Sequence, residues 1–240
     1  MKSRLGSLLA AAMFAAALPA AAADTRPTVV ELFTSQGCSS CPPADRLLGE
    51  LAERGDVLAL GYHIDYWDYI GWSDPFASPE ATARQRAYGR ALDLRGVFTP
   101  QMVVDGAESV VGSRSRDVTR ALERAPSSRP AAVAVTVEMP APERLHVEIG
   151  AGHHAGPPAE IVLVRFDEAH TTSVARGENR GRTLTDVNVV RDFTVIGRWT
   201  GAPVSLDTAI PPGELPGGCA VLVQTAGHGP ILGAAQVAIR

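Results

Sequence analysis

The hydrophobic pattern of the first half of the chain alternates between strand-like and helix-like segments. Residues 28–34 are β-branched and apolar, which predicts a buried strand. Residues 42–52 predict a helix because Leu47, Leu48 and Leu51 fall on one face. Further strands and helices are predicted over 57–64 (strand), 78–94 (helix), 101–105 and 109–111 (a hairpin around Asp105-Gly106), and 115–124 (helix). This alternation indicates an α/β domain.

The pattern changes after residue 125. The segment Pro126-Ser127-Ser128-Arg129-Pro130 predicts a linker. Beyond it, short alternating runs separated by turn residues cover 131–138, 145–149, 160–166, 187–199, 204–208, 220–225 and 231–239. Such spacing is typical of an antiparallel β-sandwich. We therefore expect an α/β domain over 24–125 and a sandwich-like antiparallel β-domain over 131–240.

The first residues of the chain have the three parts of a secretory signal peptide. A basic start, Met1 to Arg4, precedes an uncharged and mostly apolar run, Leu5 to Leu18, and then the small residues Ala20 to Ala23. The run is shorter than the ~20 residues that span a bilayer. We expect a signal peptide over 1–23, cleavage near Ala23, and a periplasmic or secreted protein without stable membrane insertion.

Charge and composition argue against two classes of function, lysine Schiff-base chemistry and nucleic-acid binding. The formal net charge of -4 becomes -6 once Lys2 and Arg4 are removed, and Lys2 is the only lysine. A mature chain without lysine has no amine for a Schiff base. Its arginines are scattered, so no basic tract favours nucleic acid as a partner.

The strongest chemical signal is Cys38-Ser39-Ser40-Cys41 at the junction between the first predicted strand and helix. A helix N-terminus carries unpaired N–H groups and a partial positive charge, which stabilise a thiolate. Cys38 is expected to be the exposed, attacking sulfur and Cys41 the resolving sulfur, with no cofactor. Ser39 and Ser40 are candidate substrate-binding residues.

A later proline fits the same chemistry. Thr99-Pro100 opens the predicted strand over 101–105, and an X-Pro bond makes a cis peptide accessible at ~0.5–1 kcal/mol. The resemblance to thioredoxin-like folds, which the segments quoted next carry, implies that such a proline faces the cysteine pair and leaves the adjacent backbone free for a bound peptide. It makes Pro100 a candidate catalytic residue and Thr99 a candidate substrate-binding residue.

Three segments carry a family resemblance: Glu31 to Asp45, His63 to Asp68, and Thr99 to Gly106. They resemble a bacterial secreted family of unknown function with a thioredoxin-like fold, and 176–182 is also similar to that family. The resemblance implies a thioredoxin-like fold over 28–124 and a redox role, but no substrate. It also implies that Glu31 could correspond to the buried carboxylate that accepts a proton from the resolving thiol. The alternative is that Glu31 pairs with an arginine. The sequence departs from thioredoxins in having Gly37 before the first cysteine and Ser39-Ser40 between the two.

We expect a thiol–disulfide oxidoreductase acting on protein or small thiol and disulfide substrates. Three alternatives stay open for the cysteine pair: an inert structural disulfide, a metal site that includes His63, and a binding module that only keeps the fold. Cys219 is either a buried, inert thiol or a third thiol that relays disulfides. The aromatic stretch 66–76 either packs a helix onto the sheet or lines a peptide groove.

Overall fold

The computed structural model describes residues 26–128, 132–210 and 217–238, and the predicted signal peptide lies outside them. The first part of the chain contains β1 (Thr28–Thr34), α1 (Pro42–Ala52), β2 (Val57–His63), the short 3-10 helix η1 (Asp68–Ile70), α2 (Pro79–Ala91), β3 (Gln101–Val104), β4 (Glu108–Val111) and α3 (Ser115–Ser128). The second part contains β5 (Val135–Ala141), β6 (Arg144–Ile149), β7 (Ala159–Ser173), β8 (Thr183–Trp199), β9 (Val204–Ala209), β10 (Gly217–Gln224) and β11 (Ile231–Ala238).

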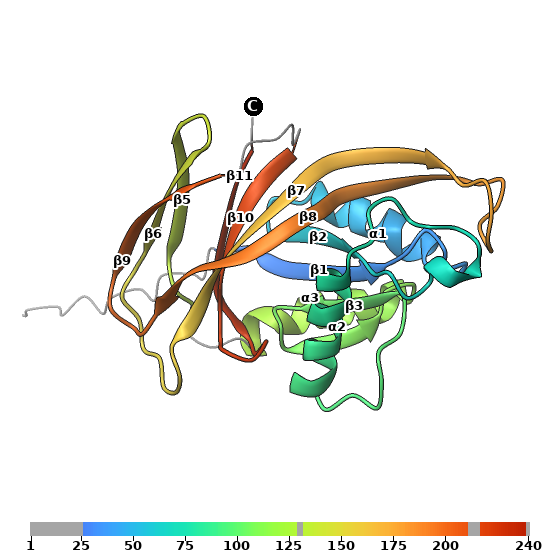
Figure 1. The fold of residues 1–240 in the computed structure, drawn as a ribbon. Helices are drawn as coiled ribbons and strands as arrows, with labels where there is room; N and C mark the ends of the chain where they lie inside the picture. The colour runs from blue at the N-terminus through green and yellow to red at the C-terminus, as the bar shows by residue number, and fades with distance from the viewer. Residues whose placement is uncertain (1–25, 129–131, 211–216, 239–240) are drawn as a thin grey trace, which may run out of the picture.

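One sheet of eight strands runs through both parts, in the order β11-β10-β7-β8-β2-β1-β3-β4 (Figure 1). Strand β1 is parallel to β2 and antiparallel to β3, and β8 joins parallel to β2 at Gly61 and Val189. The side-chain amide of Asn188 strengthens this junction by donating to the carbonyl of Ala59 at 2.8 Å. The sheet is therefore continuous across the boundary predicted at 126–130, and the division into two domains stays a prediction.

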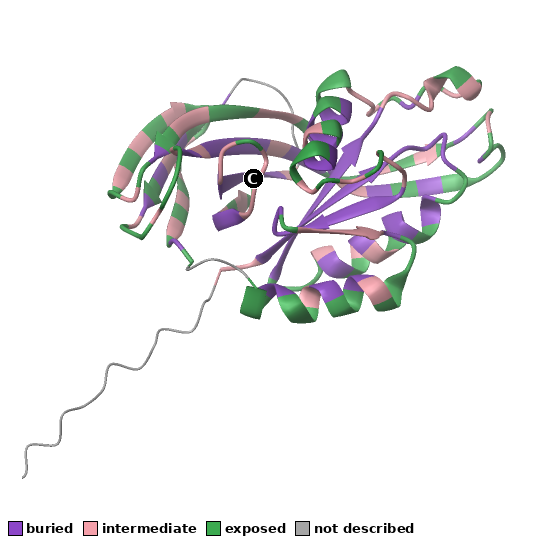
Figure 2. Ribbon diagram, turned by 90° about the horizontal axis from the view of Figure 1, so that it is seen from below, coloured by how far each residue is buried: buried purple, intermediate pink, exposed green. Residues whose placement is uncertain are grey.

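A second sheet of three strands, in the order β5-β6-β9, packs against the end of the large sheet that carries β7 and β10. Side chains of β6 such as Leu145 and Val147 meet Ile161 and Val221 of the large sheet in one apolar cluster. On β5 and β9 the exposure alternates from residue to residue, so their outer face is in contact with solvent (Figure 2).

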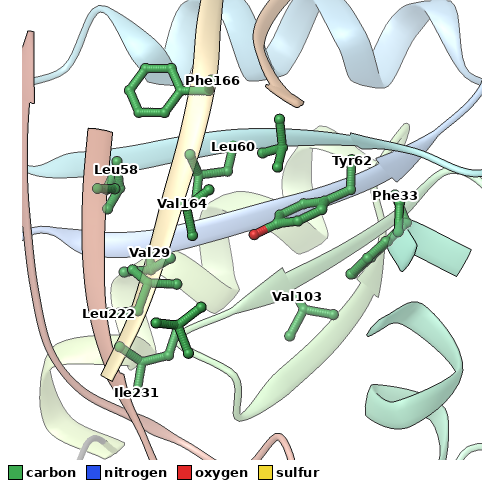
Figure 3. Packing of buried hydrophobic residues seen from close by; sticks show 14 of the residues in the cluster. Val29, Phe33, Leu58, Leu60, Tyr62, Val103, Val164, Phe166, Leu222 and Ile231 are labelled. Carbon is green, nitrogen blue, oxygen red and sulfur yellow. The ribbon is translucent and has the colours of Figure 1, made fainter. Parts of the chain in front are cut away.

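The alternation along β1 divides the core of the first part between two faces. Val30 and Leu32 pack with residues of α1 and α3, whereas Val29 and Phe33 pack with β2 and with Tyr88 of α2. Figure 3 shows the second of these clusters, in which the rings of Phe33 and Tyr62 stack at 5.3 Å between centroids. The face on which a β1 side chain lies therefore decides whether it can approach α1.

The predicted elements lie at or near their predicted positions, with two differences that matter. Helix α3 continues through Pro126 to Ser128, so the predicted linker begins inside a helix. Strands β7 and β8 are longer than predicted because their paired ends extend past the buried part of the sheet as a hairpin. Within the described ranges, none of the helices has the length and apolar character that a membrane crossing requires.

Candidate functional site

The two cysteines of the C-x-x-C motif form a disulfide at the start of α1. Their Cα atoms lie 5.4 Å apart, and Cys41 is the N-cap of the helix. Cys38 is only 1% exposed and Cys41 is 0% exposed, although Ser39 and Ser40 between them are exposed. The prediction of an exposed Cys38 is therefore wrong for the disulfide form. The reason is that segments from three other parts of the chain contact the loop that contains the motif.

The first turn of α1 does not offer the free N–H groups that were expected for the thiolate. Pro42 and Pro43 occupy the first two helical positions and have no N–H. The next two N–H groups, of Ala44 and Asp45, both donate to the carbonyl of Cys41, at 2.7 and 3.1 Å. The first turn of α1 therefore supplies no free N–H group to a sulfur at this position.

Two hydroxyl groups lie against the sulfur of Cys38. The Thr99 hydroxyl donates to Cys38 Sγ at 3.2 Å, and Ser40 Oγ lies 3.3 Å from the same atom. The indole N–H of Trp67 donates to Thr99 Oγ1 at 2.7 Å. The Thr99–Pro100 peptide bond is cis. The structure thus brings the predicted residues Ser40 and Thr99 together with Cys38, next to Pro100.

The tip of the β7–β8 hairpin, residues 174–182, completes the site from the second part of the chain (Figure 1). The side-chain amide of Asn179 donates to the carbonyls of Gln36 and Cys38, both at 2.9 Å, and Asn179 is fully buried. Glu178 accepts a hydrogen bond from the backbone N–H of Ser39 at 3.1 Å. The sequence singled out 176–182 for its family resemblance, but not as part of the cysteine site.

A buried polar cluster lies beside the same ends of β1, β2 and α1. His63 Nδ1 is 2.7 Å from Asp74 Oδ2, and His63 Nε2 is 4.0 Å from Asp186 Oδ1. Gln36 connects the two acids because its backbone N–H donates to Asp74 and its side chain donates to Asp186, both at 2.7 Å. Asp45 accepts a hydrogen bond from the Thr34 hydroxyl at 2.6 Å. The sequence identified only His63 of this cluster, since its members come from four separate segments.

Burial and mutual charge shift the ionisation of this cluster. Burial, with repulsion from Asp186, raises the pKa of Asp45 to about 7, although the Thr34 hydroxyl lowers it. Burial alone would lower the pKa of His63, but attraction by Asp74 and the other acids raises it to about 9. Near neutral pH the cluster therefore contains an imidazolium and a carboxyl group that can gain or lose a proton. Perturbed groups of this kind are enriched at functional sites.

Glu31 does not lie on the side of β1 that faces the cysteine pair. Its carboxylate accepts from Arg84 Nε at 2.7 Å and from the Tyr88 hydroxyl, both on α2. Glu31 follows Val29 and precedes Phe33 on the face of β1 that packs against α2, whereas α1 covers the opposite face. The geometry corresponds to the pairing with an arginine that the sequence left as the alternative.

The third cysteine lies far along the chain in a different core. Cys219 is fully buried in the cluster between the two sheets, and burial raises the pKa of its thiol to about 11. A thiol in this state is a poor nucleophile. Among the described residues, no group of three or more His, Cys, Asp and Glu side chains is arranged to hold a metal ion.

The fold and the site define an α/β protein with a cysteine pair at a strand-to-helix junction. A hairpin from the second half of the chain contacts the loop that contains this pair. The chain belongs to the protein family of unknown function DUF1223, whose model matches residues 29–224. It is similar to a protein of Agrobacterium tumefaciens of known crystal structure, with 36% sequence identity, a TM-score of 0.76, and coverage of 88% of this chain and 93% of the other. It also shares its fold with HBP35 of Porphyromonas gingivalis, at 12% identity and a TM-score of 0.63, covering 90% of this chain and 76% of that one. No curated protein matches the chain.

Proposed function

We propose that this chain is an exported thiol–disulfide oxidoreductase with a thioredoxin-like first half, in which Cys38 and Cys41 exchange with thiols or disulfides of other molecules. The observation that carries the proposal is the Cys38–Cys41 disulfide at the start of α1, with the Thr99 and Ser40 hydroxyls against the Cys38 sulfur. Such hydroxyls stabilise a thiolate, which is the reactive form in exchange.

The arrangement of the first elements supports the fold part of the proposal. The order β2-β1-β3-β4, the parallel β1–β2 pair connected through α1, and the antiparallel β3–β4 hairpin followed by α3 agree with a thioredoxin-like topology. A disulfide is also compatible with an oxidising compartment outside the cytoplasm.

The proposed oxidation of a dithiol substrate takes place in two successive exchanges. A substrate thiolate attacks Cys38 Sγ, the Cys38–Cys41 bond breaks, and Cys41 leaves as a thiolate with the bonding electrons. The second substrate thiol then attacks the mixed disulfide as its thiolate, so that the substrate is oxidised and Cys38 is released reduced. In this proposal the substrate reaches the buried Cys38 past Ser39 and Ser40, which are the exposed residues of the loop.

We assign to Asp45 the role of proton donor to the Cys41 thiolate that this step releases. It lies four residues after Cys41, and therefore on the same side of α1 one turn further on. A carboxyl with a pKa of about 7 can give a proton to the Cys41 thiolate and accept it again in the reverse reaction. Glu31 has no such position, since Arg84 and Tyr88 bind its carboxylate on the other face of β1.

The proposal is tested by measuring exchange directly. Oxidised protein is incubated with a dithiol, and reduced protein with a small disulfide, while the redox state of Cys38 and Cys41 is followed by alkylation and mass spectrometry. We expect the reduced protein to react rapidly at Cys38 near neutral pH, and the Cys38→Ser variant to lose exchange. The Cys41→Ser variant should accumulate a mixed disulfide on Cys38.

Cys219 provides the matched control for this test. The Cys219→Ala variant should exchange at the rate of the wild type, because that thiol is buried in another core. A Cys38–Cys41 disulfide that withstands millimolar dithiol in the folded protein, or a reduced Cys38 that reacts no faster than an ordinary thiol, would contradict the proposal and favour an inert structural bond.

A further inference from the structure

The hydroxyl of Thr99 lies between an indole and a sulfur, and the indole contact makes its oxygen a hydrogen-bond acceptor. Trp67 Nε1 donates to Thr99 Oγ1 at 2.7 Å, and Thr99 Oγ1 lies 3.2 Å from Cys38 Sγ. An indole N–H can only donate, so the Thr99 oxygen must act as the acceptor in the first contact. The single proton of the hydroxyl is then free to point at the sulfur.

Other groups around the sulfur are less committed to it. The hydroxyl of Ser40 lies 3.3 Å from Cys38 Sγ but also within 3.4 Å of the carbonyl oxygen of Thr99, so its one proton can serve either acceptor. The backbone N–H of Ser39 is bound by Glu178, and that of Cys41 donates to the carbonyl of Cys38. Thr99 is therefore the side chain whose hydrogen bond to this sulfur is supported by a second contact, from Trp67.

We propose that Trp67 is a positioning residue that holds the Thr99 hydroxyl as a hydrogen-bond donor to the Cys38 thiolate, and so increases the thiolate fraction of reduced Cys38. This inference rests on the proposed function, because it assigns a role in the reactivity of that sulfur. The relay runs Trp67 to Thr99 to Cys38 and connects three segments that are distant in sequence.

The position of Trp67 is itself well defined. Trp67 is the residue before η1 and is half-buried. A Cβ atom added at Gly37 would lie 3.2 Å from Trp67 Cβ, which is tighter than ordinary contacts. The absence of a side chain at Gly37 thus lets the Trp67 backbone approach the loop that carries Cys38. The aromatic stretch around Trp67 was expected either to pack or to line a groove, and the relay adds a role through Thr99.

Charged and titratable groups from neighbouring elements also lie around the loop that carries this sulfur. Glu178 of the hairpin tip places a carboxylate on the N–H of Ser39. Arg182 of the same tip binds Asn179 Oδ1 at 3.0 Å, and Asp45 lies beyond Cys41 in α1. The phenol of Tyr66, whose pKa is raised by burial although Gln85 and Thr99 lower it, interacts with the same Thr99 hydroxyl. The experiment must therefore separate the effect of the relay on Cys38 from the electrostatic effect of these other groups.

The test is a double-mutant cycle on the titration of reduced Cys38. The variants are Trp67→Phe, Thr99→Val and the double variant, and the rate of Cys38 alkylation is measured against pH with the site assigned by mass spectrometry. At pH values below the pKa of Cys38, we expect each single variant to have a thiolate fraction about three- to tenfold lower than the wild type. A change of this size is what the loss of a hydrogen bond to a charged group implies. The double variant should lose no more than Thr99→Val, because both changes remove the same donor.

Two further variants serve as controls. Trp72→Phe removes the other indole N–H of this region, which donates to Gln36 Oε1 at 3.1 Å and does not bind Thr99. It should leave the Cys38 titration unchanged. Thr99→Ser keeps the hydroxyl and should keep most of the thiolate fraction.

A measurement on the wild type covers the case in which a variant fails to fold. The chain has three tryptophans, so the indole N–H region of a nitrogen-correlated NMR spectrum contains few signals. We expect the Trp67 signal of the reduced protein to shift with the pKa of Cys38, and the Trp72 signal to shift little. If the Trp67 signal does not titrate, or if the two single variants have additive effects, the relay is overturned. If wild-type Cys38 titrates as an ordinary thiol and no variant moves it, the proposed exchange function fails as well.

Discussion

Asn179 donates a hydrogen bond to the backbone carbonyl of Cys38 across 141 residues of sequence, at 2.9 Å. The same amide also binds the carbonyl of Gln36, and its own oxygen accepts from Arg182. The buried amide thus connects the tip of the β7–β8 hairpin to the loop that contains the cysteines. The second half of the chain is part of the site and not only an attachment to it.

Replacing Asn179 with alanine should loosen the cysteine loop. The change leaves two buried carbonyls without their donor, at a cost of about 1–3 kcal/mol for each buried group left unsatisfied. Because Cys38 is buried in the disulfide form, we expect a small dithiol to reduce the variant faster than the wild type, together with faster amide hydrogen exchange over 35–41. The exposed neighbour Arg180 provides the control, and Arg180→Ala should change neither rate. Equal reduction rates in Asn179→Ala and the wild type would show that the hairpin tip does not limit access to the disulfide.

Replacing Glu178 with glutamine should make reduced Cys38 more acidic. The hydrogen bond to Ser39 lowers the pKa of the Glu178 carboxyl, so this group is an anion near neutral pH, close to the sulfur that must ionise. Removing its charge should lower the pKa of Cys38 and raise the reduction potential of the pair, since a more stable thiolate favours the reduced form. Glu178 is exposed, so the effect should shrink as salt is added.

The control for Glu178 comes from the same hairpin. Glu168 is an exposed carboxylate on β7, and Glu168→Gln makes the same change of charge away from Ser39. Both variants are compared by titration of the reduced thiol and by equilibration with a glutathione buffer. A potential that is the same in Glu178→Gln as in the wild type would show that the contact with Ser39 is only structural.

Replacing Glu31 with alanine should destabilise the fold without changing the reactivity of Cys38. The change leaves Arg84 buried without its carboxylate, which costs about 3–5 kcal/mol for a broken buried pair. Urea unfolding measures this loss, and alkylation of the reduced protein measures the thiol. The exposed pair Arg54–Asp56 is the comparison, because Arg54→Ala should cost at most about 1 kcal/mol. A shift of the Cys38 or Cys41 titration in Glu31→Ala would return Glu31 to the role of proton acceptor.

Much of the local structure could be predicted from the sequence because it depends on periodicity and on turn residues. Strand β1, helix α1 and the hairpin of β3 and β4 lie within a residue or two of their predicted positions, and Ser78, the first residue of the helix predicted over 78–94, caps α2. The cysteine pair at the β1–α1 junction could likewise be predicted from two adjacent segments. These features need only neighbouring residues.

The rest of the site depends on which strands become neighbours, and the sequence pattern does not encode that. The pairing of β8 with β2 brings Asp186 beside His63, and the extension of the β7–β8 hairpin brings Asn179 to Cys38. Each of these polar residues lies in an ordinary strand or loop pattern when considered alone. The burial of Cys38 could not be predicted for the same reason, since the residues around it come from distant segments.

Replacing Asp45 with asparagine should change how the stability of the protein depends on pH. Burial raises the pKa of Asp45 from 3.8 to about 7, so the folded protein keeps a proton that the unfolded chain releases at lower pH. The contribution of this group to stability is therefore full below pH 3.8 and falls as pH rises toward about 7. Asparagine cannot ionise, and its oxygen can still accept from the Thr34 hydroxyl.

The difference in unfolding free energy between Asp45→Asn and the wild type should therefore grow in favour of the variant between pH 4 and 7, by an amount on the order of a few kcal/mol. Urea unfolding at a series of pH values measures it, and His63 stays charged in the folded state over this range because its pKa is about 9. The same variant should slow the exchange reaction, since Cys41 loses its proton donor. A gain in stability with unchanged exchange would mean that the buried Asp45 carboxyl only destabilises the fold and has no chemical role. The proton in the proposed step would then have to come from solvent.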